Sequence, residues 1–181
     1  MDKLEAFART VDRLNEAVGR AVSWLTLAMV LVTFTVAVMR YGFNWGLVWV
    51  QETYVWMHGL VFMLGAGYTL LHNGHVRVDV FYRPAGIRYR AWVDFLGSLL
   101  LLMPLVLVIF YVSWPYVAES WSKLEESREA GGLPGLFLLK TAILLFAVLV
   151  GLQGLSLAAK ALLALRGRPE LLTAQDAADA R

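Results

Sequence analysis

Ionisable side chains within long apolar runs are the residues of this sequence most able to do chemistry. His58 is the only titratable residue near the middle of such a run, whereas Lys140 and Glu52 stand near the ends of two others. A charge within hydrocarbon is costly and marks function where it occurs. We expect Lys140 to reach outward along its flexible stem and Arg40 to neutralise Glu52. Because no Asp, Glu, Lys or Arg lies mid-run, an ion- or proton-coupled path through this chain alone is disfavoured.

The three histidines raise the question of a haem or metal centre. His58 and His72 stand 14 residues apart, about four helical turns, so both lie near one helix face. Each haem would need a second axial ligand from a facing helix, and the other apolar runs contain no histidine. His72 and His75 lack a third ligand for a metal. We therefore predict no catalytic residue, metal or cofactor, interpret His58 as a hydrogen-bonded packing residue, and expect that the protein is not an enzyme.

Small residues at helical spacing predict close helix packing in two of the apolar runs. In the last run they recur at steps of four, three and four, and the glutamine beside them can hydrogen-bond across an interface. Two alternatives stay open, namely packing within this chain and docking on a larger membrane partner. The candidate subunit-packing residues are Gly59, Gly65, Gly67, Ala147, Gly151, Gln153, Gly154 and Ala158.

The elements that position these residues follow from the composition. The chain has 181 residues, of which 59% are hydrophobic and 17% charged, against about 45–50% and about 25% in soluble domains. The charges crowd into short segments, and each uncharged run between them has roughly the 20 residues that a helix needs to cross a bilayer. We predict an all-α integral membrane protein, with a single four-helix domain over residues 1–165 and a cytoplasmic tail over 166–181. The predicted spans are about 21–39, 47–71, 94–118 and 134–160.

Basic residues beside the spans predict their orientation. The N-terminal tail, the second loop and the C-terminal tail carry four Lys or Arg each, whereas the first loop carries one and the third carries two. Both termini and the second loop should therefore be cytoplasmic, and the first and third loops should face outward. The basic excess reflects these inner segments and not a nucleic-acid surface. No signal peptide is expected, because no clear small-residue cleavage site follows the first run.

Apolar residues before the first span predict an amphipathic helix, because they recur at spacings of three and four. This helix either lies in the membrane interface or on a partner, or it is a cytoplasmic extension of the first span. Both alternatives stay open on the sequence. The residues are Leu4, Phe7, Val11, Leu14 and Val18.

The two longer loops carry different signals. In the third loop, Glu119 and Lys123 form an i,i+4 pair on an outward continuation of the third helix, which Gly131 and Gly132 would end. Pro134 then suits the first turn of the fourth helix. In the second loop we expect a short interfacial helix with arginines close to lipid phosphates. These lipid-headgroup candidates are Arg77, Arg83, Arg88 and Arg90.

Short motifs follow one another in order from the first loop to the last span. The most specific is Gly74-His75-Val76-Arg77-Val78-Asp79, directly after the second span. Over residues 40–153 the pattern resembles the small membrane subunit of tripartite ATP-independent periplasmic (TRAP) transporters, the DctQ type. The other matching positions are Arg40, Trp49, Glu52, Leu64-Gly65, Glu119-Ser120, Leu133-Pro134 and Gln153.

The resemblance implies four transmembrane helices with both termini inside, in the inner membrane of a bacterium or archaeon. It further implies a large membrane subunit that carries the substrate and sodium sites, and a periplasmic binding protein that delivers an organic acid. The small subunit would then be a non-catalytic scaffold, in contact with these partners and with lipid. Two alternatives remain: a self-contained small transporter or channel, and a haem- or quinone-linked membrane anchor.

Overall fold

The computed structural model describes residues 3–75, 82 and 84–172, and its regular elements are helices. Within these residues, four continuous helical segments are long and apolar enough to cross a membrane, which confirms the all-helical prediction. The third segment has three parts that follow one another without a break. The elements are α1 Lys3–Gly42, α2 Val48–Leu71, α4 Ile87–Gly97, the π-helical turn η1 Ser98–Leu102, α5 Met103–Ser122 and α6 Leu136–Leu165.

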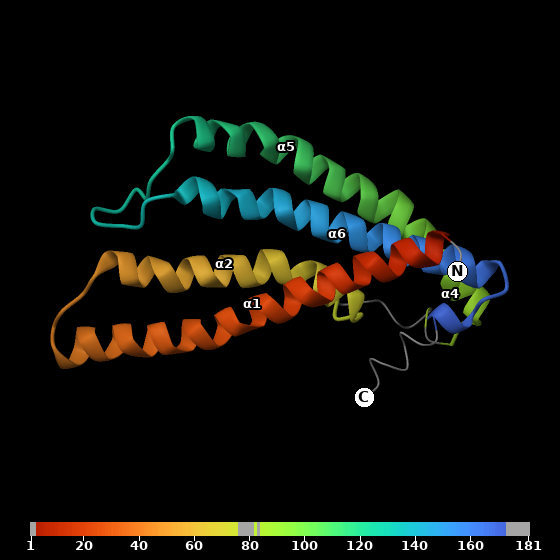
Figure 1. The fold of residues 1–181 in the computed structure, drawn as a ribbon, viewed down its shortest axis with the longest axis horizontal. Coiled ribbons are helices and arrows are strands. Elements are labelled where there is room, and N and C mark those ends of the chain that lie inside the picture. The colour runs from red at the N-terminus through yellow and green to blue at the C-terminus, as the bar shows by residue number, and fades with distance from the viewer. Residues whose placement is uncertain (1–2, 76–81, 83, 173–181) are drawn as a thin grey trace.

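The helices form two antiparallel pairs, with α1 beside α2 and α5 beside α6 (Figure 1). The start of α1 and the end of α6 lie at one end of the bundle, which we call the terminal end. Residues 43–47 and 123–135 lie at the other, which we call the loop end. Helix α6 contacts α1, α2, α4 and α5 and buries twelve residues, against six in α1. It is therefore the central helix of the bundle.

The first helix pair is buried only towards the terminal end. The buried residues of α1 run from Glu5 to Val22, and those of α2 are Gly67 and Leu71. Residues 23–42 of α1 contribute none. The loop-end half of α1 therefore leaves many apolar side chains exposed, and that of α2 leaves Val48, Trp49 and Val55 exposed.

The amphipathic pattern before the first span belongs to α1 itself. A helix of 40 residues is about 60 Å long, roughly twice the thickness of the hydrocarbon core. Its first half packs on α6, with Ala8, Val11 and Asn15 buried. Of the two alternatives raised by the sequence, the structure therefore shows the extension of the first span, and this extension packs inside the chain.

The third segment contains two prolines, Pro104 and Pro115, and the first of them follows the π-helical turn. Pro104 has no N–H to donate, and its ring crowds the carbonyl four residues earlier. Directly before it, the backbone N–H of Met103 bonds to the oxygen of Ser98, five residues back, which is the wider π-helical pattern. The wider turn relieves this crowding at Pro104, and the helix continues to Ser122.

The prediction that the third helix continues to Gly131 is wrong, because α5 ends at Ser122. Leu124 adopts a left-handed conformation with φ 44°, and the N–H of Glu125 bonds to the carbonyl of Ser120 at 3.0 Å. Together with the bond from Leu124 to the carbonyl of Trp121, this is a Schellman motif. The motif usually uses glycine, so a leucine in this position left no signal in the sequence.

The fourth helix begins later than predicted. Its N-cap is Gly135, with φ 96°, and its first residue is Leu136. Pro134 therefore precedes the helix and does not lie in its first turn. The short helix expected in the second loop falls on residues 76–81 and 83, which lie outside the described residues.

Candidate functional sites at the two ends of the bundle

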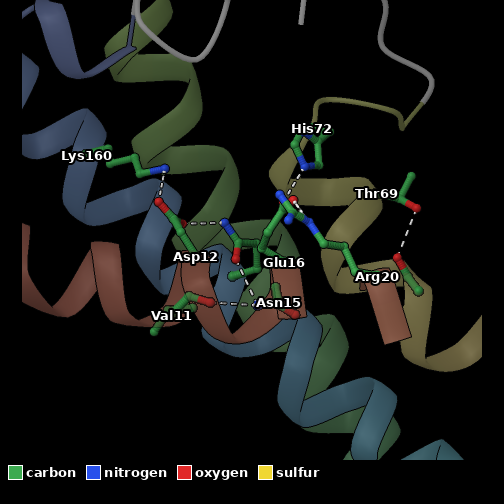
Figure 2. Close-up of polar contacts among 10 residues, drawn as sticks. Val11, Asp12, Asn15, Glu16, Arg20, Thr69, His72 and Lys160 are labelled. Carbon is green, nitrogen blue, oxygen red and sulfur yellow. Dashed lines mark hydrogen bonds and ion pairs between the residues drawn. The ribbon is translucent and has the colours of Figure 1, made fainter. Parts of the chain in front are cut away.

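A buried polar network joins α1 to α6 near the terminal end (Figure 2). One oxygen of Asp12 accepts hydrogen bonds from Gln153 Nε2 at 3.0 Å and Ser156 Oγ at 2.8 Å. The other oxygen lies 2.7 Å from Lys160 Nζ. Asn15 Nδ2 donates to Gln153 Oε1 at 2.8 Å. We call these five residues the α1–α6 network; it fixes the register of the two helices.

Burial explains why the network holds so many mutual contacts. Asn15, Gln153 and Ser156 are at most 1% exposed, and a buried polar group without a partner is costly. Gln153 meets this requirement by donating to Asp12 and accepting from Asn15. The positive charge of Lys160 balances the carboxylate of Asp12. The glutamine that the sequence singled out as able to bond across an interface therefore bonds between two helices of the same chain.

Small residues let α1 and α2 approach around this network. A Cβ added to Gly67 would lie 2.1 Å from Asn15 Oδ1, and one added to Gly19 would lie 2.3 Å from the ring of Tyr68. Neither position has room for a side chain. Gly67, one of the predicted packing residues, thus contacts α1 directly.

Ion pairs extend the terminal end beyond the network. Glu16 lies 2.7 Å from both Arg20 Nε and His72 Nε2, so it links α1 to the end of α2 (Figure 2). Glu5 lies 2.8 Å from Arg168, just after α6. The Glu5 carboxylate raises the pKa of the Arg168 guanidinium above its ordinary value. The helix ends that gather here are therefore joined by charge as well as by packing.

The small-residue stripe of α6 faces the third segment. A Cβ on Gly154 would lie 2.7 Å from Leu102 in η1, and one on Gly151 would lie 3.3 Å from Val106 in α5. Ala147 belongs to the same buried cluster as Val106. These residues are thus close packing positions between helices of this chain.

The remaining packing candidates occupy less crowded positions. Ala158 is buried. A Cβ on Gly59 would make an ordinary contact, 3.5 Å from Leu139, and one on Gly65 would meet nothing within 4 Å. Gly65 is therefore free of the steric constraint that applies at Gly67, two residues away.

At the loop end, Glu52 of α2 holds the segment between α5 and α6. Its carboxylate accepts hydrogen bonds from Ser127 Oγ and, at 2.6 Å, from the backbone N–H of Leu133. A Cβ on Gly132 would lie 2.7 Å from the same carboxylate. We call these four residues the loop clamp. The expected pairing of Glu52 with Arg40 is not found among the described residues.

A second set of contacts fastens the same loop to α6. Lys140 pairs with Glu125, and its Nζ lies 4.0 Å from the centre of the Tyr116 ring. Trp121 Nε1 donates to Thr141 Oγ1 at 2.9 Å. The neighbouring Lys140 lowers the pKa of the Glu125 carboxyl below its ordinary value. The loop is therefore held from both α2 and α6.

Other positions of the family pattern lie around the loop end. Glu119 pairs with Lys123 on the exposed side of α5, as the spacing predicted. Ser120 is buried at 1% exposure, whereas Trp49 of α2 is 49% exposed. Arg40 is exposed at the end of α1. Trp49 and Arg40 are thus at the surface, where lipid or another protein can reach them.

The second-loop candidates are described only in part. The Gly74 N–H bonds to the carbonyl of Thr69 at 2.8 Å and closes the end of α2. The Arg90 guanidinium lies 5.7 Å from the centre of the Tyr82 ring. Arg88 and His75 are exposed. The remaining candidates, Arg77, Asp79 and Arg83, lie outside the described residues.

Sequence reasoning did not single out the acidic and amide partners on α1. Asp12 and Asn15 fall within the amphipathic pattern, where polar residues are ordinary. A signal was nevertheless present in α6, because Gln153, Ser156 and Lys160 stand at i, i+3 and i+7 and so form one polar face on an apolar helix. Within the described ranges no three His, Asp or Glu residues are grouped to hold a metal.

Fold and contacts together define the class of this protein, an all-helical multi-pass membrane protein whose polar clusters join helices to each other and to a loop. Residues 29–165 match the family model of the DctQ component of tripartite ATP-independent periplasmic transporters. The chain therefore belongs to the DctQ family, whose members are transporter components and not enzymes.

A curated relative supports this assignment. The chain is 36% identical over 63 residues to the C4-dicarboxylate TRAP transporter small permease protein DctQ of Vibrio cholerae. This match covers 35% of the chain and 27% of the relative, so it spans about a quarter of the relative's length. No solved structure matches the chain.

Proposed function

We propose that this protein is the small, non-catalytic scaffold subunit of a sodium-coupled TRAP transporter in the inner membrane. The observation that carries the proposal is the family match over residues 29–165. The buried polar contacts support a scaffold role, because they join helix to helix at the terminal end and helix to loop at the loop end. The relative's name specifies C4-dicarboxylates, which supports an organic acid as the substrate of the whole transporter.

Two partners complete the proposed assembly. A large membrane subunit carries the substrate and sodium sites, and a periplasmic binding protein delivers the substrate. The loop over residues 123–135 is the proposed contact with the binding protein. Its attachment to α2 and α6 supports this role, because Glu52 and Lys140 hold it in one arrangement before any partner arrives.

Reconstitution tests the proposed function. Liposomes that contain this chain and the large subunit should accumulate an organic acid when the binding protein and an inward sodium gradient are present. Liposomes with this chain alone should show no uptake. Sodium-driven uptake by this chain alone would contradict the scaffold proposal and favour a self-contained transporter.

A further inference from the structure

The uncharged runs of α1 and α6 have their centres at different levels along the bundle. The run in α1 covers residues 21–39 and is centred on Val30, and the run in α6 covers residues 141–159 and is centred on Val150. If the bundle stood upright, with its long axis along the membrane normal, the two centres would have to share one level to lie together at the middle of the hydrocarbon. The contacts between the helices show that they do not.

The centre of the α1 run is level with the start of α6. Val30 and His58, in the middle of α2, line the same hollow. The next residue of α2, Gly59, lies against α6, because a Cβ there would be 3.5 Å from Leu139. Leu139 belongs to the first turn of α6. Figure 1 shows the same offset, since α1 and α2 reach further at the loop end than α5 and α6.

The centre of the α6 run is level with the first half of α1. A Cβ on Gly67 of α2 would lie 2.1 Å from Asn15 Oδ1 and 3.3 Å from the carbonyl oxygen of Leu149. Asn15 also donates a hydrogen bond to Gln153. From Leu139 to Leu149, α6 rises by about 15 Å. The two runs are therefore offset by about half the thickness of a hydrocarbon core, which is about 30 Å.

An upright bundle would place charge within the hydrocarbon. If the α6 run filled the core, the level of Asn15 would be the midplane, and three exposed arginines of α1 would lie within about 10 Å of it. These arginines are Arg9, Arg13 and Arg20. If the α1 run filled the core instead, the ion pair of Lys140 with Glu125 would lie near the midplane. Charge at such depth is costly, so neither upright position suits this chain.

Exposed aromatic residues on the third segment mark a second pair of boundaries. Tyr89 and Trp92 are followed 22 residues later by Tyr111 and Trp114, about 33 Å further along the helix. All four are at least 47% exposed, and the exposed large apolar side chains between the two pairs are all valine or leucine. Tyrosine and tryptophan are enriched at both membrane interfaces. The spacing of the pairs fits a hydrocarbon core of about 30 Å.

The aromatic residues of α1 show the same offset as the charges. Trp24 and Tyr41 are 72% and 86% exposed, and their midpoint falls at the hollow, level with Leu139. The midpoint of the aromatic pairs on the third segment falls beside Leu102, which packs against Gly154 of α6. Leu139 and Gly154 are 15 residues apart, or about 22 Å. Two independent sets of residues therefore give an offset in the same direction.

We propose that the bundle crosses the bilayer obliquely, with its long axis inclined by roughly 40° to the membrane normal. Helices α1 and α5 both contact α6, and packed helices lie about 8–10 Å apart, so an offset of about 15–22 Å between α1 and α5 requires an inclination of this order. At the terminal end, the surface that meets lipid headgroups then runs from Arg20 on α1 to Arg88 at the start of α4. At the loop end, Lys140 moves out of the hydrocarbon. The inference uses only this chain and a bilayer, so it does not depend on the proposed function.

Spin labels at two pairs of positions test the inclination. The chain has no cysteine, so Leu14→Cys, Val30→Cys, Leu101→Cys and Val108→Cys each create a single labelling site, and all four residues are exposed. The full chain is placed in vesicles of phosphatidylethanolamine and phosphatidylglycerol, and the accessibility of each nitroxide to oxygen and to a water-soluble nickel chelate reports its depth. We expect positions 30 and 101 near the midplane, and position 108 about 10 Å closer to the midplane than position 14.

An upright bundle gives a different pattern of depths. Leu14 and Val108 lie at about the same level of the bundle, because Asn15 and Val106 contact neighbouring turns of α6. Equal depth at positions 14 and 108 would therefore overturn the proposal. So would a label at position 30 or 101 that lies outside the hydrocarbon, because these two positions are about 20 Å apart along the bundle and share the midplane only if the axis is inclined.

Polarised infrared spectroscopy tests the inclination on the unlabelled parent chain. The dichroism of the amide I band in oriented bilayers gives the mean angle between the helix axes and the membrane normal. We expect roughly 40°, whereas transmembrane helices are inclined by about 20° on average. A mean angle of about 20° or less would overturn the proposal. As a control on the spin labels, the circular dichroism of each labelled variant should match that of the parent chain.

Discussion

Asp12 joins α1 to α6 through both oxygens of its carboxylate. Its two oxygens contact Gln153, Ser156 and Lys160 on three successive turns of α6. Each contact alone is an ordinary hydrogen bond or ion pair, worth about 0.5–3 kcal/mol. Together they make one residue of α1 the common acceptor for a polar face of α6, and loss of that residue removes three contacts between the two helices.

Replacement of Asp12 should therefore destabilise the bundle. Asp12→Ala removes the carboxylate that Gln153, Ser156 and Lys160 share, and we expect a loss of about 1–3 kcal/mol in the free energy of unfolding. Denaturant unfolding in detergent micelles measures the change. The matched control is Glu119→Ala, which removes an exposed i,i+4 pair and should have a much smaller effect than Asp12→Ala. An equal effect of the two substitutions would contradict a special role for the α1–α6 network.

Glu125 should make the loop end sensitive to acid. Its pKa lies below the ordinary value of 4.5 because of Lys140, so its ionised form is favoured in the folded state. This contribution is present above pH 4.5 and is lost as the pH falls through the lowered pKa. The melting temperature of the parent chain should exceed that of Glu125→Gln at pH 7, and the difference should shrink below pH 4.5. A difference that stays constant down to pH 3 would contradict the ion pair.

At the scale of elements, α6 organises the fold and glycine sets the distance between helices. Helix α6 packs against several other helices. The absence of side chains at Gly151 and Gly154 gives the third segment space to approach it. On the opposite side, Gly67 lets α2 approach Asn15. The π turn before Pro104 also affects helix packing, because η1 contacts α6 where Leu102 lies against Gly154.

Two glycines of α2 differ in whether a larger side chain would fit: Gly67 is crowded by Asn15, and Gly65 has open space around it. Gly67→Ala would place a Cβ 2.1 Å from Asn15 Oδ1, so Asn15 must move and its bond to Gln153 weakens. Gly65→Ala meets nothing within 4 Å and gains about 0.5–1 kcal/mol of helix propensity. We expect a lower melting temperature for Gly67→Ala and an unchanged or higher one for Gly65→Ala. The reverse order would show that α1 and α2 are not in this close contact.

At the scale of the whole molecule, the two ends of the bundle have different structures. The terminal end is closed by the α1–α6 network, by the hydrogen bond between Glu16 and His72, and by the ion pair of Glu5 with Arg168. The loop end is held by the loop clamp and by Lys140, while the neighbouring halves of α1 and α2 stay uncovered. The molecule is therefore held by polar contacts at both ends and leaves an exposed apolar surface beside the loop end.

The proposed orientation can be tested because the chain has no cysteine. Glu126→Cys places a thiol in the loop at the loop end, and Arg166→Cys places one just after α6; both positions are exposed. In intact spheroplasts, a membrane-impermeant maleimide should label position 126 and spare position 166, and both should react after lysis. Labelling of position 166 alone before lysis would reverse the orientation predicted from the basic residues.

The sequence by itself determined the class of fold, because a chain in hydrocarbon must satisfy its backbone within helices, and long uncharged runs therefore specify how many helices there are and about where they lie. It also marked Gly67, Gly151, Gly154 and Gln153 as packing residues, since small and polar groups stand out in apolar helices. Only the tertiary structure decided their partners. The bond from Glu52 to Ser127 joins residues 75 positions apart, and the network on Asp12 depends on how α1 is rotated and shifted against α6. No local pattern encodes that rotation and register; they arise when all the helices pack at once.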